Sequence, residues 1–91
     1  MPYTIKLTDD FKTKALKCFK RHPDVYERYK KTMVILEDNP FHPSLRLHKL
    51  QGKKSDYHSV SITMSYRMII EFIITDKEII PMDIGTHDEV Y

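Results

Sequence analysis

The sequence contains one cysteine, two glycines and no long apolar run, and each scarcity excludes a class of protein. Cys18 cannot form an intrachain disulfide, and its place in a helical pattern beside Phe19 predicts a small buried hydrophobic residue. Gly52 and Gly85 are too few for a glycine-rich phosphate-binding loop. No apolar run approaches the roughly 18 residues of a membrane span, and the segment MPYTIKLTDD has no apolar signal-peptide core. We therefore expect a cytoplasmic protein that does not bind a membrane.

The histidines show no metal-binding spacing. The sequence contains neither HxxxH nor CxxC, so we expect no metal and no other cofactor. No serine lies in a nucleophile-elbow motif, which argues against catalysis by a nucleophilic serine. The five histidines are His22, His42, His48, His58 and His87.

Length and charge indicate one small domain with a polyanion partner. The 91 residues form one domain, residues 1–91. Residues 1–54 carry 13 Lys/Arg against 6 Asp/Glu, a net charge of +7, whereas residues 55–91 carry 2 against 7, a net charge of −5. A basic half is typical of proteins that bind a polyanion, although two solvated lysine-rich helices would give the same charge count.

Residues 3–37 have the pattern of a strand followed by two helices. The alternation in YTIKL predicts a strand over residues 3–7. The segment TDDFKTKALKCFKRH predicts a helix that has Thr8 as its N-cap and ends before Pro23, and a second helix is expected from Asp24 to Glu37. The side chains expected on the buried faces are Phe11, Ala15, Cys18 and Phe19, then Val25, Tyr29, Met33 and Leu36.

From Ser44 the hydrophobic period changes to two, which predicts strands. We expect strands at SLRLHKL, YHSVSITM, YRMIIEFII and IIPMDI, with QGKKSD as a polar loop. The side chains expected to face the core are Val60, Ile62 and Met64, then Tyr66, Met68, Ile70, Phe72 and Ile74, and finally Ile80, Met82 and Ile84.

Short loops between these strands predict antiparallel pairing. The expected fold class is α+β, in which an N-terminal strand precedes a two-helix hairpin packed on one face of a small, mainly antiparallel β-sheet. Since Ile62 and Met68 must face the same core, the loop at Met64–Tyr66 should contain an odd number of residues.

The opposite face of the sheet carries one basic residue, Arg67. It shares that face with serines, a threonine and Glu71, and it has two interpretations. An ion pair with Glu71 would be structural, whereas contact with a phosphate would use the planar, permanently charged and bidentate guanidinium. The polar residues expected on this face are Ser59, Ser61, Thr63, Arg67 and Glu71.

The segment IGTHDEVY carries an imidazole and a phenol four residues apart. If the segment is helical, His87 and Tyr91 lie on one face of the helix. The chain has, in this order, a predicted strand, two predicted helices, LEDNP, LHKLQG, HSVSITMSYRMIIEF and IGTHDEVY. This order resembles the RelE/ParE superfamily of bacterial toxins over essentially the whole chain. The HxLxG element, the YR after a hairpin turn and the GTH followed by an aromatic residue resemble most the YafQ-type branch of RelE.

This resemblance implies a RelE-like fold and the toxin of a type II toxin–antitoxin system. RelE-type toxins cut mRNA in the A site of the 70S ribosome, need no metal, and are silenced by a cognate antitoxin in a toxin–antitoxin hetero-oligomer. In the cut, the 2′-hydroxyl of the RNA attacks the adjacent phosphate. This chemistry needs a base for that hydroxyl, a cation for the charge that develops on the phosphate, and an acid for the leaving 5′-oxygen.

Four residues of this chain match catalytic positions of the family. Arg67 matches the arginine after the hairpin turn, which implies stabilisation of the transition-state phosphate. His48 in LHKLQG and His87 in GTH match histidines implied in proton transfer. Tyr91 matches an aromatic residue that transfers a proton or stacks on a base.

Five further residues are expected to bind RNA. Arg46, Lys49, Lys53 and Lys54 lie on or beside the segment of His48, where cations would hold the RNA backbone. Ser61 stands where relatives often carry Lys, Arg or His.

The substitutions at Ser61 and Ser65 depart from the family pattern, because the YafQ type has an acid at the position of Ser65. The general base therefore stays unassigned. His58 is a poor substitute, since the alternation turns it toward the Val60 face.

Two other functions stay open. ParE-like toxins share the fold, and their implied target is DNA gyrase, but they lack the histidines that match His48 and His87. A catalytically weakened homologue that only binds its antitoxin would also fit Ser61 and Ser65.

Overall fold

The computed structural model describes residues 3–52, 56–73 and 75–91. Its elements, in chain order, are β1 (Thr4–Ile5), α1 (Asp9–Arg21), α2 (Pro23–Asp38), the 3₁₀ turn η1 (Pro43–Leu45), β2 (His48–Lys49), β3 (Tyr57–Ser61), β4 (Tyr66–Ile73), β5 (Glu78–Thr86) and α3 (His87–Val90). The predicted α+β order is confirmed. The first strand is shorter than the predicted residues 3–7.

Capping and proline set the bounds of the two long helices. Thr8 Oγ1 accepts a hydrogen bond from the Phe11 N–H at 3.1 Å, which makes Thr8 the N-cap of α1 as predicted. Asp9 and Asp10 occupy the first turn, where the helix dipole favours acids. Pro23 then ends the run of α1 and occupies the first turn of α2.

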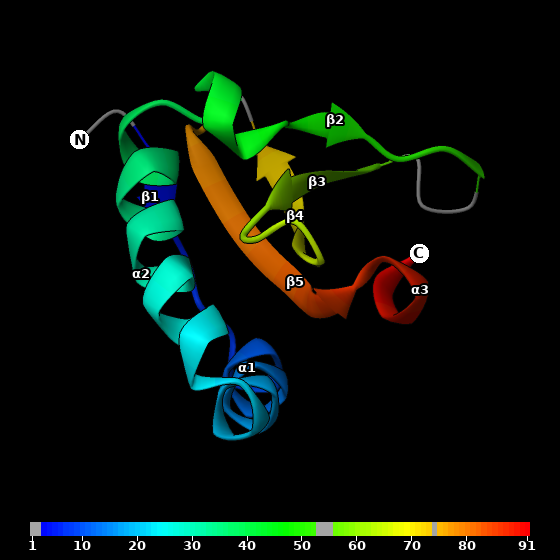
Figure 1. Ribbon diagram of the computed structural model, residues 1–91. Coiled ribbons are helices and arrows are strands. Elements are labelled where there is room, and N and C mark those ends of the chain that lie inside the picture. Colours follow the sequence, from blue (N-terminus) through cyan, green and yellow to red (C-terminus); the bar gives the residue numbers. More distant parts are fainter. Residues whose placement is uncertain (1–2, 53–55, 74) are drawn as a thin grey trace.

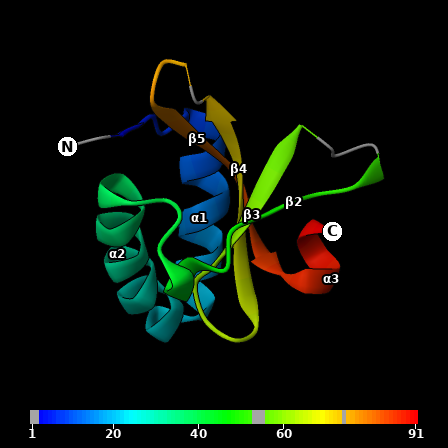
Figure 2. The same ribbon diagram turned by 90° about the horizontal axis from the view of Figure 1, so that it is seen from above.

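The sheet has the order β1-β5-β4-β3-β2. β1 pairs with β5 in parallel, and the other pairs in this sheet are antiparallel, which confirms the mainly antiparallel sheet. Helices α1 and α2 lie on one face of the sheet and α3 lies on the other (Figures 1 and 2). The predicted two-helix layer is therefore confirmed, and the site residues on the opposite face lie near α3.

Two apolar clusters hold these layers together. The larger core lies between the helix pair and the sheet, and its buried members are Phe11, Ala15, Val25, Leu36, Leu45, Val60, Ile62, Met68, Ile70, Ile79 and Ile84. Cys18 is half-buried against this core. The α3 cluster lies on the opposite face, and consists of Leu50, Ile69 and Val90 with Tyr57 and Met82 packed beside them. This second cluster fixes α3 to the sheet.

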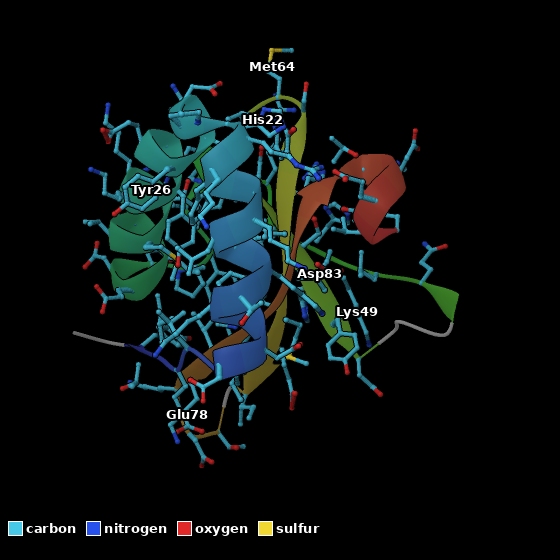
Figure 3. All side chains as sticks on the ribbon, turned by 90° about the horizontal axis from the view of Figure 1, so that it is seen from below. His22, Tyr26, Lys49, Met64, Glu78 and Asp83 are labelled. Atoms are coloured by element: carbon cyan, nitrogen blue, oxygen red, sulfur yellow. The ribbon has the colours of Figure 1, made fainter. Side chains whose placement is uncertain are left out.

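The turn between β3 and β4 confirms the predicted odd loop. Val60 lies opposite Met68, and the Ile62 N–H donates to the Tyr66 carbonyl at 2.9 Å, so Thr63, Met64 and Ser65 form the loop. The prediction that Met64 faces the core is wrong, because its side chain is 98% exposed at the tip of this turn (Figure 3). The alternation of the strand ends where the turn begins.

A bulge in β5 overturns the prediction that Ile80, Met82 and Ile84 share a face. Ile69 lies opposite Asp83 and Ile70 lies opposite Pro81, so Met82 is an extra residue in β5. The bulge changes the side-chain parity, and Met82 packs in the α3 cluster while Ile84 packs in the larger core. Pro81 lacks the N–H that a regular ladder would use, which is consistent with a bulge at this place.

The predicted strand SLRLHKL is mostly not a strand. Pro43–Leu45 forms the 3₁₀ turn, Arg46 adopts a left-handed conformation with φ 48° and ψ 45°, and only His48–Lys49 pairs with β3. Proline at the start of the turn favours this local helix over an extended strand. The predicted core residue Ile74 lies outside the described residues, as do Lys53 and Lys54.

Candidate functional site

The helix α3 positions two of the predicted catalytic side chains. The Tyr91 N–H donates to the His87 carbonyl at 3.0 Å, so the segment makes the helical turn that brings the two residues onto one face. Their rings lie 4.1 Å apart between centroids and are tilted by 57°. The prediction that His87 and Tyr91 point the same way is confirmed.

Glu89 and Val90 hold this short helix in place. Glu89 Oε1 accepts a hydrogen bond from the Thr86 N–H at 2.8 Å, which satisfies a backbone donor at the start of the helix. This backbone hydrogen bond lowers the pKa of the Glu89 carboxyl because it favours the charged form. Val90 is 1% exposed and anchors the helix in the α3 cluster.

Gly85 allows α3 to lie directly on β5. A Cβ atom at Gly85 would lie 3.1 Å from Glu89 Cβ and 3.2 Å from Val90 Cγ1. Both distances are shorter than ordinary carbon contacts. A residue with a side chain at this position would therefore require Glu89 and Val90 to shift by a few tenths of an ångström.

The phenol of Tyr91 makes hydrogen-bond contacts with residues of β2 and β3. Tyr91 Oη lies 3.0 Å from His48 Nε2, although the two residues are 43 positions apart in sequence. It also donates a hydrogen bond to Ser59 Oγ at 2.5 Å. His48 Nδ1 lies 3.2 Å from the Arg46 carbonyl oxygen, so the ring is held at both nitrogens. The structure thus brings His48, His87 and Tyr91 together.

A cavity of about 400 Å³ opens beside this group. Its lining residues are His48, Lys49, Leu50, Gln51 and Tyr91. Lys49 is exposed and lies opposite His58 in the β2–β3 pair, and its ammonium has no hydrogen bond or ion pair among the described residues. The cavity therefore offers an imidazole and a phenol to one ligand.

Arg67 lies on the same face of the sheet as α3. It pairs with Ser61 on β3 and with Gly85 on β5, and directly opposite residues in an antiparallel pair point to the same face. Ser59 is its diagonal neighbour, at a separation of about 7–8 Å in such sheets. Arg67 does not line the 400 Å³ cavity.

The guanidinium of Arg67 has an unused donor. Its Nη1 is buried and has no hydrogen-bond partner in the described part of the chain. No ion pair with Glu71 forms among the described residues, so the structural interpretation of Arg67 is not supported. A buried donor without an acceptor is costly, and an anion placed there would remove that cost.

The predicted RNA-binding residues lie at different places. Arg46 is exposed and contributes its carbonyl oxygen to His48. Ser61 is half-buried, and its hydroxyl donates to the Thr63 carbonyl at 2.9 Å. Lys53 and Lys54 lie outside the described residues.

His58 faces away from the site, as its alternation predicts. Its ring packs against Phe72 at a centroid distance of 5.7 Å, on the side of the larger core. Desolvation lowers the pKa of His58, and the charge of Lys49 lowers it further. This environment disfavours the charged imidazole.

Sequence reasoning missed Ser59 as a site residue. The alternation of β3 placed Ser59 on the Arg67 face, which was the available signal, but nothing in the sequence indicates that Tyr91 reaches it. It also missed a cluster of cations around Tyr66, where a cavity of about 160 Å³ is lined by Lys14, Lys17, Arg21 and His22 among others. His22 packs on Tyr66 at a centroid distance of 5.2 Å.

The described residues contain neither a candidate metal site nor a helix that could span a membrane. No group of three or more His, Cys, Asp or Glu side chains in residues 3–52, 56–73 and 75–91 is arranged to hold a metal ion. None of the helices in these ranges has the length and hydropathy to span a bilayer.

No protein-family model matches the chain, and no curated protein sequence matches it. Solved structures do match. YafQ from E. coli strain BL21(DE3) superposes with a TM-score of 0.80 at 22% identity, covering 98% of each chain. YafQ in the E. coli DinJ–YafQ toxin–antitoxin complex gives a TM-score of 0.79 at 22% identity, covering 100% of this chain and 99% of that one.

A YoeB/ParE toxin from Agrobacterium tumefaciens gives a TM-score of 0.73 at 15% identity, covering 92% of this chain and 98% of that one. These matches extend over almost the whole length of each toxin. This chain therefore has the α+β fold of the YafQ and RelE-like toxins.

Proposed function

We propose that the protein is the toxin of a type II toxin–antitoxin system, and that it cuts mRNA in the ribosomal A site as an endoribonuclease. The observation that carries this proposal concerns Nη1 of Arg67, which is buried and has no hydrogen-bond partner among the described residues. It lies on the same sheet face as the linked phenol and imidazole of Tyr91 and His48. A phosphate is an anion whose oxygens would accept from that guanidinium.

The proposed reaction breaks one bond of the RNA and forms another. The 2′-oxygen attacks the adjacent phosphorus, the bond from phosphorus to the 5′-oxygen breaks, and a cyclic 2′,3′-phosphate and a 5′-hydroxyl result. The proton of the 2′-hydroxyl passes to a base, and an acid gives a proton to the 5′-oxygen. The nucleophile belongs to the RNA, so the reaction needs no metal-bound water.

The site offers a group for each task. Arg67 would stabilise the charge of the phosphorane. His48 and His87 contact Tyr91 from two sides, so one imidazole can take the 2′-proton while the other supplies a proton to the 5′-oxygen. An imidazole suits both tasks because it changes charge near neutral pH.

Cations and the cavity would hold the RNA strand. Lys49 follows His48 on β2 and is exposed, so it can contact a phosphate of the strand at the edge of the sheet. Arg46, Lys53, Lys54 and Ser61 are proposed to bind RNA on the grounds of the sequence. The 70S ribosome would present the strand.

The proposed partner is a cognate antitoxin in a cytoplasmic complex. The DinJ–YafQ structures support it because they hold a toxin of this fold with its antitoxin. Large apolar side chains on the helix pair are exposed and could take an amphipathic segment: Leu16 is 59% and Val34 is 67% exposed. Co-expression with the antitoxin should restore growth, and toxicity that persists at full co-expression would contradict this partner.

The test is induction in a bacterial host, followed by primer extension on a reporter mRNA and by cleavage on purified ribosomes. We expect growth arrest and cuts that require ribosomes. Growth arrest without ribosome-dependent cuts, together with inhibited DNA gyrase, would establish the ParE-like alternative. A folded chain that binds antitoxin but neither arrests growth nor cuts mRNA would establish the weakened homologue.

A further inference from the structure

Ser59 is a fully buried polar residue whose hydroxyl reaches the catalytic candidates. It is 0% exposed and lies opposite His48 in the β2–β3 pair. The hydrogen bond that the structure gives its side chain runs to Tyr91 Oη, at 2.5 Å. Since Tyr91 Oη also contacts His48 Nε2 at 3.0 Å, the three side chains form one continuous chain of hydrogen bonds.

The Arg46 carbonyl determines which ring nitrogen of His48 carries a proton. A carbonyl oxygen can only accept, so His48 Nδ1, at 3.2 Å from it, must donate. In neutral His48 the other nitrogen, Nε2, is then an acceptor. In charged His48 both nitrogens donate. Tyr91 must therefore donate to His48 in one state and accept from it in the other.

The rotatable hydroxyl of Ser59 permits Tyr91 to contact both the neutral and the charged form of His48. When His48 is charged, Nε2–H donates to Tyr91 Oη, and the Tyr91 hydroxyl donates to Ser59 Oγ, which is the direction found in the structure. When His48 is neutral, Ser59 donates to Tyr91 and Tyr91 donates to Nε2. The charged state gains more from Ser59, because a hydrogen-bond chain that begins at a cation is polarised along its length.

We propose that Ser59 is a positioning residue of a three-membered proton relay, Ser59–Tyr91–His48, and that its hydroxyl supports the charged form of His48, the general acid for the leaving 5′-oxygen. This inference rests on the proposed function. Tyr91 would be the residue that delivers the proton, since its ring is 39% exposed at the cavity. The Tyr91 hydroxyl turns from Ser59 to the 5′-oxygen and gives it a proton, and the proton of His48 Nε2 replaces it on Tyr91. His87 is then left as the base.

Several charged or titratable groups surround His48 and act on the same equilibrium. Lys49 follows it on β2, His58 lies across from Lys49 on β3, and His87 stacks on Tyr91 from α3. Of these groups, Lys49 is positively charged, whereas desolvation disfavours the charged form of His58.

The test compares Ser59→Ala with Ser44→Ala. The control also removes a serine hydroxyl that contacts an imidazole, since Ser44 Oγ lies 2.8 Å from His42 Nδ1, but it lies outside the site. We expect Ser59→Ala to cleave about five- to tenfold more slowly at neutral pH, the effect of one lost hydrogen bond. The fall of the rate at high pH should begin at a lower pH. Ser44→Ala should match the wild type in both measurements.

A double variant distinguishes a role of Ser59 in the proton relay from a role in packing alone. In a Tyr91→Phe background the chain is already broken, so adding Ser59→Ala should change the rate by less than about twofold. Equal effects of Ser59→Ala in both backgrounds, or an unmoved pH profile, would overturn the relay. Melting temperatures of all variants show whether each is folded.

NMR titration of the free protein tests the relay without RNA. The His48 ring should keep its added proton to a higher pH in the wild type than in Ser59→Ala or Tyr91→Phe. An unchanged titration in both variants would overturn the inference whatever the cleavage data. A shifted titration in a protein that cuts no RNA would leave the relay intact and instead contradict the proposed function.

Discussion

Arg67 has a property at the residue scale that folding alone does not explain. Its Nη1 is buried without a partner among the described residues, and such a donor costs about 1–3 kcal/mol of folding free energy. Natural proteins retain costs of this kind mainly where function requires them. We therefore expect substitutions of single site residues to change the rate of mRNA cleavage more than the melting temperature.

We expect Arg67→Ala to cut ribosome-bound mRNA at least about a hundredfold more slowly, because the phosphorane loses a fixed cation. The melting temperature should stay near that of the wild type, since the variant also loses the unpaired buried donor. Arg28→Ala, which removes an exposed arginine of α2, is the control and should cleave normally. A wild-type rate in Arg67→Ala would show that Arg67 is structural.

His87→Ala should likewise slow cleavage about a hundredfold, because an imidazole near neutral pH contributes 10²–10⁴ in such proton transfers. The side chain is exposed and lies outside both apolar clusters, so melting and ribosome binding should be retained. Rate and binding are measured on the same ribosome preparation. Loss of binding together with rate would mean that His87 holds RNA and does not transfer a proton.

At the scale of elements, α3 is the part that assembles the site. It has only the residues His87–Val90, so propensity cannot stabilise it, and it depends on its cap, on Val90 and on close contact with Gly85. A small change at any of these points should move Tyr91 away from His48.

Gly85→Ala should lift α3 and separate Tyr91 from His48. The added Cβ would meet Glu89 Cβ at 3.1 Å, and overpacking of this kind costs about 1–3 kcal/mol. We expect a lower melting temperature and a large loss of cleavage. The control is Ala15→Gly in α1, on the other face of the sheet, which should lower the free energy of unfolding by about 1 kcal/mol. Its cleavage rate, measured well below its melting temperature, should match that of the wild type. Equal rates for the two variants would show that the seating of α3 is unimportant.

The cap of α3 should weaken in acid. The Thr86 N–H lowers the pKa of Glu89 below its ordinary value of 4.5, so the charged carboxylate stabilises the fold above that value. The contribution is lost as the pH falls through the lowered pKa of the folded state. NMR contacts between Tyr91 and His48 should therefore fade in acid before the larger core unfolds. Glu89→Gln, which keeps an acceptor but does not titrate, should not show this Glu89-dependent step, and an identical acid profile would contradict the assignment.

At the scale of the whole molecule, the positive charge gathers on the chain before residue 55. Part of it surrounds Tyr66, the neighbour of Arg67, in a cavity lined by Lys14, Lys17 and Arg21. Glu89 also lines this cavity, and Lys14 forms an ion pair with Asp10 at 3.2 Å. This face could hold ribosomal RNA backbone while the site holds the message.

The double variant Lys17→Ala/Arg21→Ala should weaken ribosome binding and reduce its dependence on salt. Each lost phosphate contact lowers the slope of log affinity against log salt by about one unit. Lys30→Ala is the control, since Lys30 pairs with Glu27 at 2.7 Å on α2. Filter binding over a salt series measures both. An unchanged slope in the double variant would mean that the cluster is only a solvated surface.

Local signals in the sequence determined the two long helices and the side-chain alternation of β3 and β4. Thr8, Pro23 and the spacing of Phe11 and Ala15 act within a few residues, so they can be read without the fold. The side-chain parity around the β3–β4 turn predicted its odd length for the same reason. The catalytic roles of His48, Arg67, His87 and Tyr91 were inferred from the resemblance to the RelE-type toxins, and they stay predictions.

Only the tertiary structure decided which of these side chains meet. Ser59 and Tyr91 are 32 positions apart, and their contact requires the pairing of β3 with β4, of β4 with β5, and the seating of α3 on Gly85. The bulge at Met82 similarly reversed a face that the alternation had assigned. The physical reason is that strand register and helix seating depend on sums of long-range contacts, which no short stretch of sequence contains.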